Sequence, residues 1–326
     1  MIIQNILKSN YAPTTGGGIY AKKVDNMTNI KCHFLSNLAR KSGGAVFVQD
    51  TMKVYLNILC EFNDNKANTL GGSVEIKSVT YSIYNNTVFY NSKGGALSLK
   101  FIKSLVILQC KFVNNSLINY AGSGSIHLDN VISISIIESY FKNSVGILGA
   151  ALYGIHIKGL LHLSSSSFLT NKGLRSGGVM HIVKSSSATI KIKKCLLIQN
   201  SAASDGGVLF IENCHVFIVY QCNYMKSKAK KSGGVMKGKG VDVIGIFNSN
   251  FSDSEVQRYG GAFSFQDIKN ITIIRCKFES SFANLGSVYH IKYCRNMLLA
   301  SCSIAESYAK FQGGGIFAEN VSHVII

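Results

Sequence analysis

Apolar and polar residues alternate along this chain in short segments that begin just after a pair of small residues, most often Gly-Gly. In SGGAVFVQDTMKVYLNILCEFNDN (residues 42–65), a first alternating run includes Val46 and Val48, and a second apolar run ends in Cys-x-Phe-x-x-Asn. A period of two over four to eight residues indicates β-strands with one buried face. The segment therefore predicts two strands joined by a turn and closed by a second turn at the Asn.

The same phrase recurs along the whole chain. The second small residue of each pair is a marker: Gly18, Gly44, Gly72, Gly95, Gly124, Ala150, Gly178, Gly207, Gly234, Gly261, Ser287 and Gly315, at intervals of 23 to 29 residues. The residue two places after each marker is apolar, from Tyr20 in the first unit to Phe317 in the last. Self-similarity at this period is the signature of a solenoid. We predict one domain, residues 1–326, of about 12 coils with about 27 residues each.

The closing phrase repeats in register and predicts columns of like residues. Its aromatic place holds Phe34, Phe62, Phe89, Phe112, Phe141, Phe168, Leu197, Tyr224, Phe251, Phe278 and Ile304, and its last place holds Asn or Ser. If each strand pairs in parallel with its equivalent about 4.8 Å away, these residues form an aromatic stack and a side-chain amide ladder. The fold class is then all-β, a single-stranded parallel β-helix, right-handed by the crossover rule. A leucine-rich repeat is the rival, but its leucine register and helical return segment are absent.

The order Phe-x-x-Asn followed by Gly-Gly-Ala/Val resembles the repeats of the polymorphic outer-membrane proteins. It is also similar to repeats of large protist surface proteins in the pectin-lyase-like β-helix group. FLSN (residues 34–37) before GGAV and FLTN (residues 168–171) before GGVM carry this resemblance. It implies an extracellular, adhesive or coat-forming module, and it brings no catalytic residues to this chain.

The net charge is the feature of the sequence that says most about possible binding partners. The chain has 34 Lys and Arg against 16 Asp and Glu, a net charge of +18. A basic rod attracts anionic polysaccharide or a membrane surface. The densest basic run, residues 225–240, provides the candidate anion-binding patch: Lys226, Lys228, Lys230, Lys231, Lys237 and Lys239. No aromatic-interleaved basic module is present, so we expect no specific binding of nucleic acid.

Candidate catalytic chemistry is sparse in the sequence. Enzymes on parallel β-helices use clustered carboxylates, whereas the acidic residues here share no register. No P-loop, G-x-S-x-G or C-x-x-C motif occurs, so we expect no cofactor and no metal. We interpret the chain as non-enzymatic. A carbohydrate-active β-helix enzyme and an intracellular scaffold remain the alternatives.

The cysteines and histidines have structural interpretations. Seven of the nine cysteines occupy one ladder place, where we expect buried thiols acting as small apolar residues. Stacked pairs such as Cys32/Cys60 leave oxidation open. Three histidines, His127, His181 and His290, share the place three after the marker, and we expect them on the surface.

Both ends of the chain read as ordinary repeat units. Terminal units of solenoids are normally atypical caps, because an open coil exposes unpaired backbone and apolar core. We therefore expect a piece of a longer protein whose neighbouring coils continue the stack at both uncapped ends. The functional expectation is a structural or adhesive module at the cell surface or in the ectodomain of a membrane protein.

Overall fold

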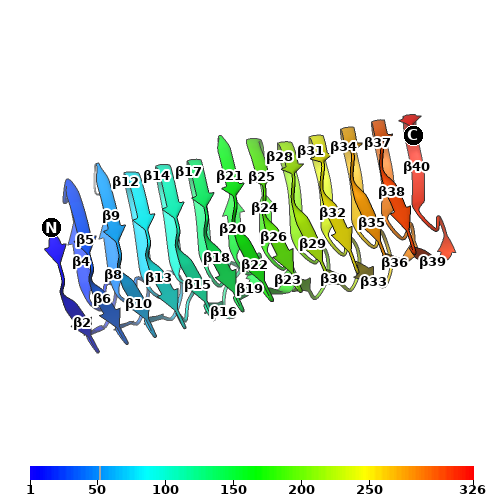
Figure 1. Cartoon of the computed structure of the whole chain (residues 1–326). Coiled ribbons are helices and arrows are strands. Elements are labelled where there is room, and N and C mark those ends of the chain that lie inside the picture. Colours follow the sequence, from blue (N-terminus) through cyan, green and yellow to red (C-terminus); the bar gives the residue numbers. More distant parts are fainter. Residues whose placement is uncertain (51–52) are drawn as a thin grey trace.

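The chain forms a straight solenoid in the computed structural model, with its two termini at opposite ends (Figure 1). The structure describes residues 1–50 and 53–326, and this part is all-β, without a helix. Consecutive turns pair in parallel and in register. The predicted parallel β-helix of about 12 turns with about 27 residues per turn is confirmed. No helix of the described residues is long and apolar enough to cross a membrane.

Each coil contributes strands to three parallel rows, here named sheets A, B and C. Sheet A contains β1 (Ile2–Ile3), β4 (Ile19–Lys22), β5 (Asn26–Ile30), β8 (Val46–Gln49), β9 (Val54–Ile58), β12 (Val74–Asn85), β14 (Leu97–Leu108), β17 (Ile126–Ile137), β20 (Leu152–Ile155), β21 (Leu160–Ser164), β24 (Met180–Val183), β25 (Ser185–Lys193), β28 (Leu209–Tyr220), β31 (Met236–Phe247), β34 (Phe263–Ile274), β37 (Tyr289–Ala300) and β40 (Ile316–Ile325). Sheet A is the long side of the coil.

Sheets B and C are built from shorter strands. Sheet B contains β2 (Ile6–Lys8), β6 (His33–Leu35), β10 (Glu61–Asn63), β13 (Val88–Tyr90), β15 (Lys111–Val113), β18 (Tyr140–Lys142), β22 (Ser167–Leu169), β26 (Leu196–Ile198), β29 (Asn223–Met225), β32 (Asn250–Ser252), β35 (Lys277–Glu279) and β38 (Ser303–Ala305). Sheet C contains β3 (Tyr11–Ala12), β7 (Leu38–Ala39), β11 (Lys66–Ala67), β16 (Ser116–Leu117), β19 (Val145–Leu148), β23 (Lys172–Ser176), β27 (Ser201–Ala202), β30 (Lys228–Ala229), β33 (Glu255–Val256), β36 (Phe282–Leu285) and β39 (Tyr308–Gln312). Sheet C is interrupted in the short third coil, where Lys93 supplies only an isolated bridge to each neighbour.

Most coils turn at four corners, each made by one residue in the left-handed backbone region. In the second coil these residues are Gly43 (φ 64°), Asp50 (φ 58°), Leu59 (φ 54°) and Asp64 (φ 53°). Glycine is required at the first corner, because a Cβ on Gly43 would lie 2.6 Å from the carbonyl oxygen of Val46. The other three corners leave room for a side chain that points outward, so they carry most of the variation between coils.

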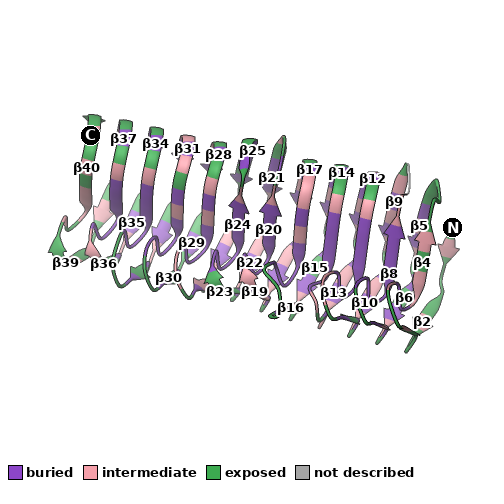
Figure 2. Ribbon diagram, turned by 180° about the vertical axis from the view of Figure 1, so that it is seen from behind, coloured by how far each residue is buried: buried purple, intermediate pink, exposed green. Residues whose placement is uncertain are grey.

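The predicted aromatic column forms the centre of the core. Six rings stack from Phe34 to Phe168, with consecutive ring centroids 4.5 to 4.9 Å apart. Leu197 interrupts the column, and Tyr224, Phe251 and Phe278 continue it at 4.8 and 4.9 Å. All of these side chains are buried. Figure 2 shows the burial concentrated in the middle coils, while the terminal coils are more exposed.

The asparagine ladder connects successive coils at the corner between sheets B and C. The Nδ2 of Asn37 donates to Oδ1 of Asn65 at 3.0 Å, and Asn171 donates in the same way to Asn200 at 3.0 Å. Asn65 also donates to the carbonyl oxygen of Phe34 at 2.7 Å. Buried amides thus hold the stacked corners together. Serine replaces asparagine in several coils, which leaves the ladder discontinuous.

The sequence-based register was wrong by one residue in the first and last units. Ile19 pairs with Val46, and Ile316 pairs with Tyr289, so these isoleucines occupy the inward place. Tyr20 and Phe317, which we expected there, lie one residue further on and face outward. Both units begin with three glycines, Gly16–Gly18 and Gly313–Gly315, so the pattern of small residues alone does not fix the register there.

Replacing a ring in the middle of the aromatic column tests the stacked core. We expect Phe112→Ala to lower the free energy of unfolding by about 3–5 kcal/mol, because it leaves a cavity between two stacked rings. Phe112→Leu should lose less, since Leu197 occupies the equivalent place in another coil. Denaturant unfolding followed by circular dichroism measures both. Equal losses for the two variants would contradict the stacking interpretation.

Candidate binding groove

The six lysines of the predicted patch are divided between two sides of the solenoid. Lys226 lies at the corner before β30, Lys228 lies in β30, Lys230 and Lys231 follow β30, and Lys237 and Lys239 lie in β31 of sheet A. The Gly233-Gly234 corner separates the first four from the last two. They are neighbours in sequence, but the coil turns between them, so the structure does not bring them together as one patch.

Two of these lysines are engaged by carboxylates of adjacent coils. The Nζ of Lys228 lies 2.6 Å from Glu255, and the Nζ of Lys239 lies 3.7 Å from Glu212. All four side chains are largely solvated, so each pair contributes about 0–1 kcal/mol to stability. Neither lysine offers a free charge to a ligand unless the carboxylate is displaced.

Lys237 is unsuited to binding an external anion. Its side chain is half-buried and donates to Oγ of Ser264 at 3.1 Å. Burial lowers the pKa of Lys237, because the charged form loses hydration. Lys226, Lys230 and Lys231 are exposed and take part in none of the ion pairs among the described residues.

A surface groove runs along the corner between sheets B and C and includes Lys226 and Lys228. Its volume is about 830 Å³, and it crosses the sixth to tenth coils. The lining residues are Thr170, Gln199, Asn200, Ser201, Lys226, Lys228, Asp253, Ser254, Glu255, Ser280 and Phe282. We call this surface the polar groove. At the coil spacing of a parallel sheet it is about 20 Å long.

Two rows of side chains form the walls of the polar groove. One row is the left-handed corner that precedes the Asn/Ser ladder, with Gln199 (φ 54°), Lys226 (φ 53°) and Asp253 (φ 52°) in three successive coils. The other is the outward place of sheet C, where Lys228 pairs with Glu255 across the backbone register. Register between coils, not proximity in sequence, brings these residues together. The sequence could have indicated this wall of the groove, because each of its residues directly precedes the Asn or Ser of the ladder.

The lining combines hydroxyl, amide, ammonium and carboxylate groups with one aromatic ring. Phe282 is partly exposed in the groove and stacks against Tyr308 of the next coil, with centroids 5.8 Å apart. Fixed polar groups beside an apolar surface are typical of small-molecule and saccharide sites. The groove is open to solvent along its length, which suits an extended chain ligand.

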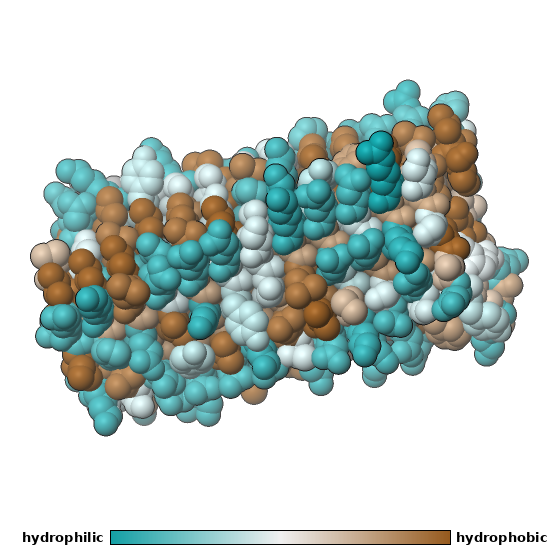
Figure 3. Space-filling view, viewed as in Figure 1, coloured by the Kyte–Doolittle hydropathy of each residue, from teal (hydrophilic) through white to brown (hydrophobic). Residues whose placement is uncertain are grey.

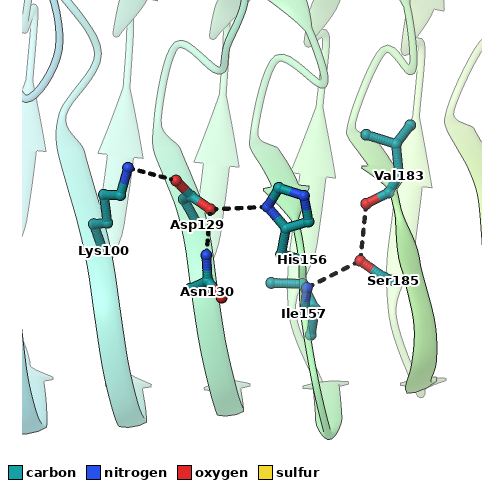
Figure 4. Close-up of polar contacts among 7 residues, drawn as sticks. All are labelled: Lys100, Asp129, Asn130, His156, Ile157, Val183 and Ser185. Atoms are coloured by element: carbon teal, nitrogen blue, oxygen red, sulfur yellow. Dashed lines mark hydrogen bonds and ion pairs between the residues drawn. The ribbon is translucent and has the colours of Figure 1, made fainter.

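A second cluster of charged residues lies on sheet A, near its left-handed corner (Figure 4). Asp129 accepts from Nζ of Lys100 at 2.9 Å and lies 3.2 Å from Nδ1 of His156, both on adjacent coils. Partial burial acts to raise the pKa of Asp129, but the hydrogen bonds from Lys100 and His156 outweigh it, so the pKa lies below its usual value. Asp129 is therefore a neutralised structural anion.

The same arrangement occurs again further along the rod. Asp242 lies 2.7 Å from Nζ of Lys269 and 2.8 Å from Nδ1 of His215. Hydrogen bonds from Lys269 and His215 lower the pKa of Asp242. Each cluster contains one carboxylate between a lysine and a histidine. No group of three or more His, Cys, Asp or Glu in residues 1–50 and 53–326 is arranged to hold a metal ion.

Of the three histidines that we expected on the surface, His181 and His290 are buried and His127 is half-buried. His127, His181 and His290 face outward from sheet A, but the residues before the glycine corner cover them. Nδ1 of His181 lies 3.1 Å from Oγ of Ser176, and the ring of His290 packs 4.7 Å from Tyr259. Burial lowers the pKa of each of the three histidines to about 4. The alternation of apolar and polar residues along the strand correctly predicted that these side chains face outward. It could not predict that residues of a neighbouring corner cover them.

All nine cysteines are free, and all except the half-buried Cys302 are buried. The backbone N–H of Cys195 donates to Sγ of Cys222 at 3.4 Å, which shows how closely the stacked thiols approach. Burial raises the pKa of Cys110 to about 12, so this thiol is protonated at neutral pH. The ladder cysteines thus fill core space as small residues, as expected.

Comparisons with known proteins give little beyond the fold. No family model matches the chain, and no curated protein matches it. One solved structure is similar, the catalytic domain of a GH87 alpha-1,3-glucanase in complex with tetrasaccharides. The alignment covers 99% of this chain and 62% of that chain, at 8% identity and a TM-score of 0.27. The chain therefore spans less than two thirds of that structure.

This comparison corrects one expectation from the sequence. We expected a chain without enzymatic activity, whereas the similar structure is the catalytic domain of an enzyme. Scattered carboxylates in the sequence were the reason for that expectation. They are a weak guide, because the structure places two of these acids, Asp253 and Glu255 of one coil, together in the lining of the polar groove.

The buried histidines predict a loss of stability in acid. Their pKa values are about 4 in the folded state and 6.5 when unperturbed, so below pH 6.5 the unfolded chain binds protons that the folded chain excludes. We expect the free energy of unfolding to fall as pH decreases from about 6.5 to about 4. His290→Phe should flatten this dependence, since Phe210 fills the same place in another coil. His323→Gln, on an exposed histidine that takes part in none of the ion pairs among the described residues, is the matched control and should give the slope of the natural chain.

Proposed function

We propose that this β-helix binds an acidic linear polysaccharide in the polar groove. The observation that carries the proposal is the groove itself: about 830 Å³, crossing five coils, with Lys226 and Lys228 at its centre and Phe282 at one end. Hydroxyl and amide groups from the other coils supply hydrogen bonds to sugar hydroxyls. The aromatic ring supplies an apolar face for a pyranose ring.

Charge favours an acidic chain over a neutral one. Seven of the 34 Lys and Arg lie within ion-pair distance of a carboxylate, so most of the positive charge is not neutralised within the protein. In the groove, Lys228 pairs with Glu255, and Lys226 and Asp253 take part in none of the ion pairs among the described residues. The lining is thus balanced in charge, and the surplus positive charge that attracts an anionic polymer lies on the surrounding surface. A positive surface raises the local concentration of an anionic polymer and increases its association rate. We place this binding at a cell surface, where such polymers occur.

The test compares acidic and neutral oligosaccharides at two salt concentrations. Isothermal titration with oligogalacturonate should show binding that Lys226→Gln with Lys228→Gln weakens about ten-fold or more, because the charge-assisted hydrogen bond from Lys226 is lost and Glu255, no longer paired with Lys228, repels an acidic chain. Lys31→Gln with Lys310→Gln removes the same charge near the two ends of the rod and is the control. Equal weakening by both pairs would mean diffuse charge attraction without use of the groove.

Analysis of the sugar after each titration separates binding from cleavage. Asp253 and Glu255 both line the groove, and paired carboxylates are the groups that hydrolyse glycosidic bonds. If the natural chain shortens the oligosaccharide and Asp253→Asn leaves it intact, catalysis is assigned to the groove. An intact oligosaccharide that binds would support the proposal as stated.

A further inference from the structure

Four consecutive coils expose large apolar side chains at one corner of the solenoid, where sheet A bends at its left-handed residue. Tyr81, Phe101, Ile132 and Leu160 lie in the third to sixth coils, with exposed fractions of 51%, 52%, 45% and 38%. We call these residues the corner ridge. None of them belongs to the buried core. A run of exposed apolar residues of this kind indicates an interaction surface.

Backbone pairing places the members of the corner ridge on one surface. Tyr81 pairs with Ser104, and Ser104 pairs with Ser133. The pairing of Ile134 with Leu161 aligns Leu160 with Ser133, so Tyr81 and Leu160 lie in one row. Ile132 directly precedes this row, and Phe101 lies three residues before Ser104, at the left-handed corner itself. A Cβ on Gly159, which directly precedes Leu160, would lie 2.6 Å from the carbonyl oxygen of Ile132. At the spacing of a parallel sheet the ridge is about 15 Å long. Figure 3 shows that apolar side chains gather in patches on the outer surface of the rod.

The charges around the corner ridge are mostly positive. The sheet A strands of these coils, β12, β14, β17, β20 and β21, and the corner between β20 and β21 contain four lysines and two acidic residues. Both acids, Glu75 and Asp129, are ion-paired, with Lys77 and Lys100. Lys100 also lies over the ring of Phe101, with Nζ 5.1 Å from the centroid. Neutralised acids and surplus lysines leave this region complementary to negative charge.

Two lysines flank the apolar tips and have no acidic partner among the described residues. Lys103 lies two residues after Phe101, and Lys158 lies two residues before Leu160. Exposed aromatic and aliphatic side chains beside lysines are typical of segments that bind at a membrane interface. The apolar side chains enter the boundary between headgroups and acyl chains, and the lysines contact anionic headgroups. A protein partner would need carboxylates placed opposite each lysine, whereas an anionic lipid surface meets this requirement at every position.

We infer that the corner ridge docks the rod on a lipid bilayer that contains anionic headgroups. This binding does not depend on the proposed binding of polysaccharide, because the polar groove lies at a different corner, between sheets B and C. Docking through the ridge leaves the groove open to solvent.

The experiment uses a ridge variant that preserves the backbone. Phe101 has φ 57°, and the equivalent residue of the next coil is Asn130 with φ 56°, so Phe101→Asn removes the ring without straining the corner. We combine it with Ile132→Ser. Tyr293→Asn is the matched control, since Tyr293 is a 53% exposed aromatic in the same left-handed row of the eleventh coil.

Sedimentation is measured with vesicles of phosphatidylcholine alone and of phosphatidylcholine mixed with phosphatidylserine. The natural chain should bind the mixed vesicles, and the ridge variant should bind them about ten-fold or more weakly, because two apolar side chains no longer enter the bilayer. Tyr293→Asn should bind like the natural chain. Lys103→Gln with Lys158→Gln should reduce the preference for phosphatidylserine.

Three results would overturn the inference. The natural chain could stay in the supernatant with both kinds of vesicle, the ridge variant could bind as well as the natural chain, or Tyr293→Asn could lose as much binding as the ridge variant. Unfolding transitions of all variants are recorded beside the binding data, so that a loss of fold is not mistaken for a loss of the surface.

Discussion

In-register pairing of each strand with its equivalent in the next coil is the constraint on which the rest of this structure depends. Once Phe62 pairs with Phe34 and with Phe89, each interior position becomes a column about 4.8 Å in spacing. A column admits only residues that stack well on their own kind, which explains why phenylalanine, asparagine and small thiols recur in fixed places. The coil can vary in length without disturbing these columns, as in the short third coil, which lacks a strand of sheet C while sheets A and B stay in register.

The sequence was sufficient to predict the interior, because columns leave a periodic pattern. The aromatic column from Phe34 to Phe278 lies where the repeat placed it. The register failed where the pattern was degenerate, at the triple glycines before Ile19 and Ile316. The burial of His181 was also missed, because alternation specifies which side of a strand a residue faces and not whether a neighbouring corner covers that side.

The candidate site was less predictable than the fold. A run of lysines close together in sequence suggested one patch, but a coil changes direction at every corner, so Lys226 and Lys239 lie on different sides. The polar groove instead joins residues about one coil apart, such as Lys226 and Asp253, which are separated in sequence by the length of the repeat. In a solenoid, a surface site is a property of aligned rows, and it becomes visible only when the coils are superimposed.

The corners are where this fold can acquire function without disturbing the columns. Interior positions are fixed by stacking, and outward positions on the strands are partly covered by neighbours. A left-handed corner, in contrast, directs its side chain into solvent and accepts residues as different as Lys226, Asp253, His156 and Phe101. The polar groove and the corner ridge arise at two different corners, so each row can change independently. This independence allows one rod to carry the two proposed binding surfaces on the same core.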